Sequence, residues 1–294
     1  MNKSLFVKMK QLLFLISIFP LLAIGQNTLN RTTNFPKKTV FVTSLPPKEN
    51  VCVFIMAGQS NMAGRAFVEP QDTLPNPRII SINKEKQLIR AKEPLHFYEP
   101  GLQGLDCGMS FARELINHLN KGIVVLLLPC AVGGSSINFW LNDSSFRDIH
   151  LKSNFMEKVE LAKKYGHLKG ILWHQGESDA EADKIPAYEN NLKELFKFFR
   201  QYAHDDSLPI LIGELGSYPV KLSTKRNWES INKTIDHVAF SDQYCSLVHT
   251  GDLKSKEDFI HFNSKSQRIL GQRYAVAYLE LIQQNKNKRI IKQD

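Results

Sequence analysis

Serine, histidine and aspartate residues at separate points of the chain could together hydrolyse an ester. Ser60 follows a continuous apolar run, residues 51–56, and His261 stands three residues after Asp258 near the end of the chain. A serine hydroxyl becomes a nucleophile when a histidine removes its proton, and an aspartate can hold that histidine in the correct orientation. The residue types therefore predict acyl transfer, with Ser60 as nucleophile, His261 as general base and Asp258 as its orienting acid.

The Asp258–His261 pair could also have no catalytic role, because a D-x-x-H pattern is short enough to recur by chance. Asp258 could cap a turn, and His261 could be a surface histidine. Catalysis is favoured by the joint appearance of this pair with Gly58-Gln59-Ser60-Asn61-Met62 after an apolar run. At that point Ser60 would open a helix, where its backbone N–H can stabilise an oxyanion.

Two further polar segments follow apolar runs. Gly133, Gly134 and Ser135 come after one run, and Gln175 and Glu177 come after another. Sites in parallel sheets form at the carboxyl ends of the strands, so we expect these segments to lie near Ser60. The two glycines could serve a tight turn or could let a sugar approach the backbone. Glu177 could orient its loop or cap the following helix.

Strands and helices alternate along the chain. Apolar runs predict strands at residues 51–56, 78–82, 123–128, 170–173 and 209–213, and helical periodicity predicts helices at 109–119, 154–165, 187–202, 228–240 and 265–283. Buried strands alternating with helices imply an α/β fold whose mainly parallel sheet is covered on both faces. No internal repeat or composition break interrupts the chain after residue 50.

The first 25 residues have the pattern of an export signal. Lys3, Lys8 and Lys10 precede an apolar stretch, residues 12–24, and small residues lead up to Gly25. This pattern predicts signal-peptide cleavage near Gly25 and an exported protein, with an uncleaved N-terminal anchor as the alternative. Cleavage would lower the formal net charge from +9 to about +6, since three lysines are removed.

Composition limits the remaining possibilities. The 294 residues are 43% hydrophobic and 23% charged, which excludes a disordered or fibrous chain. Only the N-terminal apolar run approaches membrane length, which excludes a polytopic membrane protein. The positive charge is spread along the chain, so it favours an acidic partner only weakly and does not indicate nucleic acid. The four cysteines could form disulfides after export or remain buried thiols.

Four blocks of this sequence resemble the successive blocks of the SGNH-type hydrolases. They are GQSNMAG at residues 58–64, GGSSI at 133–137, WHQGESD at 173–179 and DFIHF at 258–262. The chain is most similar to the branch that contains sialate O-acetylesterases and acetylxylan esterases, carbohydrate esterase family six. The resemblance extends from about residue 51 to 275. It implies a flavodoxin-like, three-layer α/β/α sandwich with a mainly parallel five-stranded sheet.

The resemblance also implies roles for individual residues. Ser60 would form the acyl-enzyme, with His261 as base and Asp258 behind it. The oxyanion would be held by the N–H of Ser60, the N–H of Gly108 and the side-chain amide of Gln175. The alternatives to Gly108 are Gly133 and Gly134. The residues expected to bind substrate or to support the site are Gln59, Asn61, Gly133, Gly134, Ser135 and Glu177.

The expected activity is removal of O-acetyl groups from a carbohydrate, with no metal and no cofactor. We expect no nucleic-acid partner and no membrane span after signal cleavage, and the sequence leaves the oligomeric state and the identity of the sugar open. The predicted organisation is a signal peptide (1–25), a lead-in segment (26–50), an esterase domain (51–284) and a basic tail (285–294). The alternatives are a carbohydrate-binding protein without turnover, and an esterase for small esters or an acetyltransferase on the same scaffold.

Overall fold

The computed structural model describes residues 31–219 and 221–291, so the expected signal peptide lies outside the described residues. The strands are β1 (Val51–Gly58), β2 (Ile79–Ile82), β3 (Leu88–Arg90), β4 (Val124–Pro129), β5 (Ser145–Phe146), β6 (Ile149–His150), β7 (His167–His174), β8 (Ile210–Gly213) and β9 (Cys245–Val248). Seven of them form one sheet in the order β3-β2-β4-β1-β7-β8-β9, and β5 pairs with β6 separately. Neighbouring strands in the large sheet are parallel, except that β3 runs antiparallel to β2.

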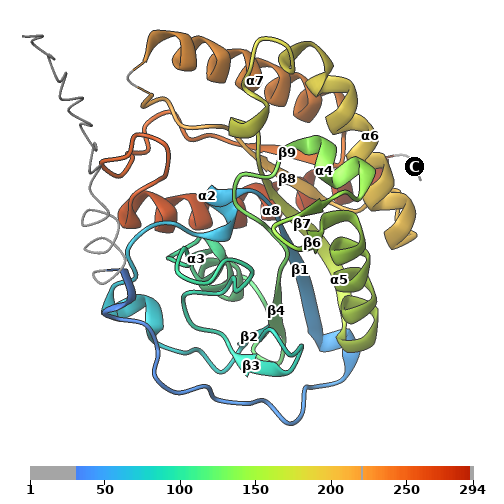
Figure 1. The fold of residues 1–294 in the computed structure, drawn as a ribbon. Coiled ribbons are helices and arrows are strands. Elements are labelled where there is room, and N and C mark those ends of the chain that lie inside the picture. The colour runs from blue at the N-terminus through green and yellow to red at the C-terminus, as the bar shows by residue number, and fades with distance from the viewer. Residues whose placement is uncertain (1–30, 220, 292–294) are drawn as a thin grey trace, which may run out of the picture.

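Helices cover both faces of this sheet. They are α2 (Ser60–Ala63), α3 (Gly108–Ile116), α4 (Ile137–Asn142), α5 (Leu151–Tyr165), α6 (Ile185–Ala203), α7 (Leu222–Ser241) and α8 (Ser264–Ile291), with 3-10 turns η1 (Lys48–Asn50), η2 (Pro70–Thr73) and η3 (Glu177–Asp179). Figure 1 shows α4 to α7 on one side of the sheet and α3 and α8 on the other. The α/β fold with three layers is therefore as expected.

Strand β1 lies at the centre of the sheet and contributes side chains to the two hydrophobic cores, one on each face of the sheet. Val53 and Ile55 pack beneath α4 to α7, whereas Phe54 and Met56 pack against α3 and α8. Burial on both faces explains the unbroken apolar run in this part of the sequence. Since β4 pairs with one edge of β1 and β7 with the other, the sheet has its topological switch point at the end of β1. That is where Ser60 begins α2.

The sheet has seven strands rather than the expected five. The two that the sequence pattern missed, β3 and β9, are the two edge strands. Both strands are short. All three residues of β3 and the two middle residues of β9 are half-buried, so neither strand needs an unbroken apolar run. An edge strand pairs on one side only and is often kept short, which weakens its signal in the sequence.

The C-terminal helix also differs from expectation. Helix α8 continues to Ile291 instead of ending near residue 283, so most of the expected basic tail is helical. Lys286 and Lys288 are exposed on it. None of the helices in residues 31–219 and 221–291 is long and apolar enough to cross a membrane.

All four cysteines lie in the described part of the chain and carry free thiols. Cys107, Cys130 and Cys245 are buried, and Cys52 is half-buried. Burial raises the pKa of the Cys130 thiol to about 12, which keeps it protonated. Of the two possibilities left open by the sequence, the structure has the unpaired thiols.

Candidate active site

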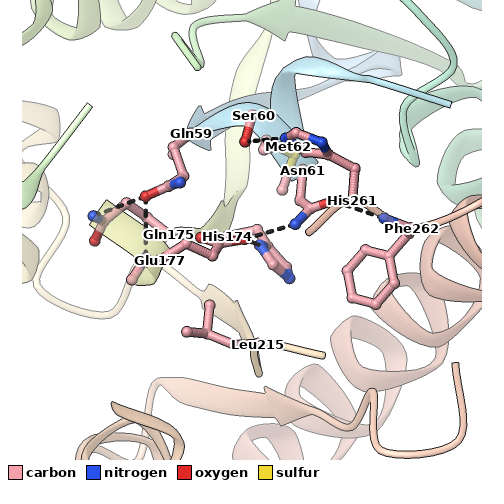
Figure 2. A network of polar contacts seen from close by, with 12 residues as sticks. Gln59, Ser60, Asn61, Met62, His174, Gln175, Glu177, Leu215, His261 and Phe262 are labelled. Carbon is pink, nitrogen blue, oxygen red and sulfur yellow. Dashed lines mark hydrogen bonds and ion pairs between the residues drawn. The ribbon is translucent and has the colours of Figure 1, made fainter. Parts of the chain in front are cut away.

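The structure brings Ser60, His261 and Asp258 into one hydrogen-bonded chain. The Nε2 atom of His261 lies 2.9 Å from Ser60 Oγ, and its Nδ1 atom lies 2.9 Å from Asp258 Oδ2. Ser60 opens α2 after the central strand, whereas the other two residues lie in the loop between β9 and α8. Figure 2 shows Ser60 and the His261 ring in contact. A neutral imidazole in this position can accept the serine proton while the carboxylate fixes its tautomer.

The loop between β9 and α8 is built around the Asp258 carboxylate. Asp258 Oδ1 accepts backbone hydrogen bonds from Ile260 at 3.0 Å and His261 at 2.9 Å, and Phe259 turns the chain at a φ of 54°. Burial would raise the pKa of Asp258, but the hydrogen bonds from the His261 ring and from these two backbone groups outweigh it. The pKa of Asp258 is therefore well below its usual range, and the group is ionised at neutral pH.

Asn61 holds the backbone on both sides of His261. Its Oδ1 accepts from Phe262 N at 3.0 Å, and its Nδ2 donates to Ile260 O at 3.2 Å. The same Nδ2 donates to Glu177 Oε1 at 2.6 Å, a contact drawn in Figure 2. Asn61 and Glu177 therefore support the site by holding the base in place. Burial raises the pKa of Glu177 to about 7.

The surroundings of His261 favour its neutral form. Burial lowers the pKa of His261, Asp258 raises it, and the positive charges of Arg65 and Lys256 lower it further. The net result is a pKa below the ordinary value of 6.5. The imidazole is therefore unprotonated at pH 7 and is able to take a proton from Ser60.

Gly108 is not at the site, so its assignment to the oxyanion hole is wrong. Its N–H donates to Asp106 Oδ1 at 2.7 Å, and an added Cβ there would lie 2.6 Å from side-chain atoms of both Met56 and Leu95. It therefore packs into the core at the start of α3. The alternative position, after β4, does face Ser60: Gly133 and Gly134 both line the same cleft.

The two glycines after β4 differ in what their N–H groups do. The N–H of Gly133 donates to Glu99 Oε2 at 2.6 Å. Gly134 is exposed at a φ of 81°, and its N–H has no acceptor in residues 31–219 and 221–291. Of the two, Gly134 is the one with a free donor. Ser135 beside it is buried and bonds to Val132 O at 2.8 Å, which places it among the supporting residues.

The Gln175 side chain does not reach the cleft, in contrast to its expected place in the oxyanion hole. It is fully buried. Its Nε2 donates to Asp179 Oδ2 at 2.5 Å, to Gln59 Oε1 at 3.2 Å and to Ser135 O at 3.2 Å. The Asp179 carboxylate draws the amide into the interior, where three acceptors share its two hydrogens.

Ser60 lies in a cleft of about 450 Å³. Its lining is positively charged, and the basic residues that line it are Arg31, Arg65, Arg147 and Lys256. Behind them Glu99 is buried and pairs with Arg65 at 2.5 Å and also with Arg147. Burial would raise the pKa of Glu99, but these two arginines and the Gly133 N–H lower it, so Glu99 stays ionised.

Sequence reasoning missed these basic residues. They come from four separate segments, and lysine and arginine are spread over the whole chain, so no local pattern distinguishes them. Only Arg65, which directly follows the GQSNMAG block, lies near a recognised motif. No three His, Cys, Asp or Glu side chains gather as a possible metal site in the part of the chain that the structure describes.

A mainly parallel sheet that carries Ser, His and Asp at the carboxyl ends of its strands has the arrangement of a serine hydrolase, and its fold is of the SGNH type. Residues 50–280 match the family described as carbohydrate esterase, sialic acid-specific acetylesterase. This chain belongs to that carbohydrate esterase family and is a carboxylic ester hydrolase.

Individual relatives are consistent with that assignment. A probable carbohydrate esterase of Arabidopsis thaliana is 31% identical over 257 residues, which cover 80% of this chain and 92% of that protein. The solved structure of this same Arabidopsis thaliana protein superposes with a TM-score of 0.69 at 29% identity, covering 80% of this chain and 99% of that one. The structure of NanS, at 16% identity, covers 82% of this chain and 100% of its own with a TM-score of 0.62, and thereby supports the fold.

Proposed function

We propose that this protein removes O-acetyl groups from a carbohydrate through an acyl-enzyme on Ser60. The observation that carries the proposal is the continuous contact from Asp258 through His261 to Ser60, with 2.9 Å at each step. The family of carbohydrate esterases to which the chain belongs supports an acetylated sugar as the substrate. In this proposal the cleft beside Ser60 receives the ester.

The reaction has two halves. Ser60 Oγ attacks the acetyl carbonyl while His261 takes its proton, and the backbone N–H of Ser60 and that of Gly134 are free to hold the oxyanion. The tetrahedral intermediate then collapses, and the sugar oxygen leaves with the proton from His261. Water attacks the acetyl-serine by the same route and releases acetate.

The charge of the cleft favours an anionic sugar. Four basic residues line it, against Asp258, the ionised Glu99 that pairs with Arg65 and Arg147, and a Glu177 whose pKa is raised to about 7, so basic groups still outnumber acidic ones. A carboxylate such as that of sialic acid fits this lining better than neutral xylan does, because arginine pairs with carboxylates in a bidentate geometry. The description of the matched family points the same way. We therefore place O-acetylated sialic acid ahead of acetylated xylan.

Acetate release from three substrates tests the proposal: p-nitrophenyl acetate, acetylated xylan and O-acetylated sialic acid. We expect the wild type to release acetate fastest from the sialic acid and Ser60→Ala to show only background hydrolysis. Equal activity of both proteins would contradict an acyl-enzyme on Ser60. A folded wild type that binds the sugars without releasing acetate would point to the binding-protein alternative, and transfer of acetate to an added alcohol would point to the transferase.

We further propose that the enzyme acts after export, because the first 25 residues have the sequence pattern of a signal peptide. Expression of the full chain in a host with a general secretion pathway, followed by N-terminal sequencing of the exported protein, tests this. We expect a mature chain that begins near Gln26. A full-length protein that stays with the cells would contradict export.

A further inference from the structure

The side-chain amide of Gln59 has a free donor beside Ser60. Gln59 is 2% exposed and lines the cleft that holds Ser60 and His261. Its Oε1 accepts from Gln175 Nε2 at 3.2 Å and from Ser178 N at 3.2 Å. Its Nε2 has no acceptor among the described residues. This nitrogen is not among the buried side-chain atoms that lack a partner, so it is open to the cleft and its hydrogens are available to an atom of the substrate.

The neighbours of Gln59 fix which end of its amide faces the cleft. The Gln175 amide nitrogen is surrounded by three acceptors, so it must be a donor there. Gln59 must therefore present its oxygen to Gln175, and the backbone N–H of Ser178 requires the same orientation. Figure 2 shows the Gln59 oxygen directed toward Gln175 and the amide nitrogen on the opposite side.

We propose that Gln59, and not Gln175, supplies the side-chain donor of the oxyanion hole. When Ser60 attacks the ester, the carbonyl oxygen acquires negative charge in the cleft that Gln59 lines. The Nε2–H of Gln59 then donates to this oxygen, and the acceptor that the amide lacks is supplied by the reaction itself. The inference rests on the proposed acyl-enzyme chemistry at Ser60 and adds to it a catalytic residue next to the nucleophile.

Gln175 is a positioning residue in this arrangement. Its amide is held by the Asp179 carboxylate at 2.5 Å and by the Tyr188 hydroxyl, which donates to Gln175 Oε1 at 3.1 Å. With both ends held, Gln175 keeps an amide hydrogen directed at Gln59 Oε1 and does not turn toward the cleft. A fixed donor on the far side of Gln59 keeps that amide from rotating, so its nitrogen is already aimed before substrate arrives.

Paired oxygen and sulfur esters test the assignment. A thionoester places sulfur where the oxyanion would form, and sulfur is a weak hydrogen-bond acceptor, so an oxyanion donor assists the oxygen ester far more. Turnover of p-nitrophenyl acetate and p-nitrophenyl thionoacetate should be measured for wild type, Gln59→Leu, Gln175→Leu and the double variant. Gln201→Leu, an exposed position on α6, is the matched control.

We expect Gln59→Leu to lower kcat on the oxygen ester by about 100- to 1,000-fold with little change in KM. The thionoester should lose much less, so the oxygen-to-sulfur ratio should fall by about tenfold or more. Gln175→Leu should reduce the ratio less, and the double variant should be no slower than Gln59→Leu within about twofold. Because each ratio compares two substrates on one sample, partial unfolding of a variant does not affect it.

Two results would overturn the assignment. If Gln59→Leu slows both esters equally, Gln59 only shapes the site. If Gln175→Leu reduces the ratio as strongly and the double variant is slower still, the Gln175 amide reaches the oxyanion itself. The p-nitrophenyl esters contain no sugar, so a failure of the proposed carbohydrate substrate would leave this result unaffected. A wild type inactive on the oxygen ester would instead remove the Ser60 chemistry on which the inference rests.

Discussion

His261 is held both through its ring and through the backbone on each side of it. Asp258 binds the ring nitrogen, and Asn61 binds the carbonyl of Ile260 and the N–H of Phe262. The imidazole is therefore held facing Ser60, although residues 257–260 of the same loop are exposed. Geometry held in this way before substrate binds is a large part of what an active site contributes to rate.

The pH dependence of turnover should follow His261. Since burial lowers its pKa below 6.5, we expect kcat/KM for p-nitrophenyl acetate to be constant near pH 7 and to fall in acid, with a midpoint below 6.5. Below the midpoint the fall should be about tenfold per pH unit, because the protonated imidazole cannot accept the serine proton. A pH–rate profile from pH 4 to 8 measures this.

Glu177 provides the control for that profile, since its pKa of about 7 lies close to the same range. Glu177→Gln keeps an oxygen for the Asn61 amide but no longer titrates. The acid limb should be unchanged in this variant. If it disappears or moves, the group that titrates is Glu177 and the pH dependence does not report the base.

Removal of the Asn61 side chain should slow the enzyme through His261. Asn61→Ala leaves the Ile260 carbonyl and the Phe262 N–H without their partner, so we expect kcat to fall by about 10- to 100-fold. The free energy of unfolding should fall by about 1–3 kcal/mol. Initial rates and urea denaturation measure the two effects, with Asn190→Ala, at an exposed position on α6, as control. Unchanged kcat would show that the loop holds His261 by itself.

At the scale of elements, the site depends on how closely β1 approaches β7. Gly58 ends β1 at a φ of 133°, and a Cβ added there would lie 2.1 Å from the carbonyl oxygen of His174. The same carbonyl accepts from Gln59 N at 2.9 Å. The absence of a side chain at Gly58 thus lets the nucleophile turn lie directly against the end of β7.

Gly58→Ala should therefore damage the fold as well as the site. An alanine would be strained at this positive φ, and its Cβ would clash with backbone atoms of β7. We therefore expect the free energy of unfolding to fall by about 2 kcal/mol or more. Gly122→Ala is a matched control, because an added Cβ there meets nothing within 4 Å. Its effect should stay within about 0.5 kcal/mol. Equal urea midpoints for the two variants would contradict the close approach.

At the scale of the whole molecule, the fold gathers positive charge that is dispersed in the sequence. Arg31, Arg65, Arg147 and Lys256 converge on the cleft from distant segments, although the formal net charge of the chain is a modest +9. A concentration of one sign of charge around a cleft attracts ligands of the opposite sign and orients them. This is the basis for placing an anionic sugar ahead of a neutral one.

Arg147→Ala should therefore affect the anionic substrate selectively. Loss of one charged hydrogen bond to a carboxylate should lower kcat/KM for O-acetylated sialic acid by about tenfold. Turnover of p-nitrophenyl acetate should be nearly unchanged, and Arg226→Ala, exposed on α7, should change neither. A uniform loss on both substrates would assign Arg147 to the structure of the site, and no loss on either would place the sugar carboxylate elsewhere.

The sequence by itself determined the layered fold and the three residues that the structure brings into one hydrogen-bonded chain. Long buried strands and amphipathic helices have local signals, and Ser60, Asp258 and His261 stand in short motifs with strong constraints on residue type. Edge strands β3 and β9 lack such a signal, because half-buried side chains break the apolar pattern.

Only the tertiary structure decided which groups face the substrate. Gln59 and Gln175 carry the same amide, and each could serve an oxyanion, but Asp179 draws the Gln175 amide inward and leaves that of Gln59 at the cleft. Gly108 and Gly134 are likewise both glycines near a helix start, and packing buries only the first. The direction of a side chain depends on contacts between distant segments, which no local pattern in the sequence contains.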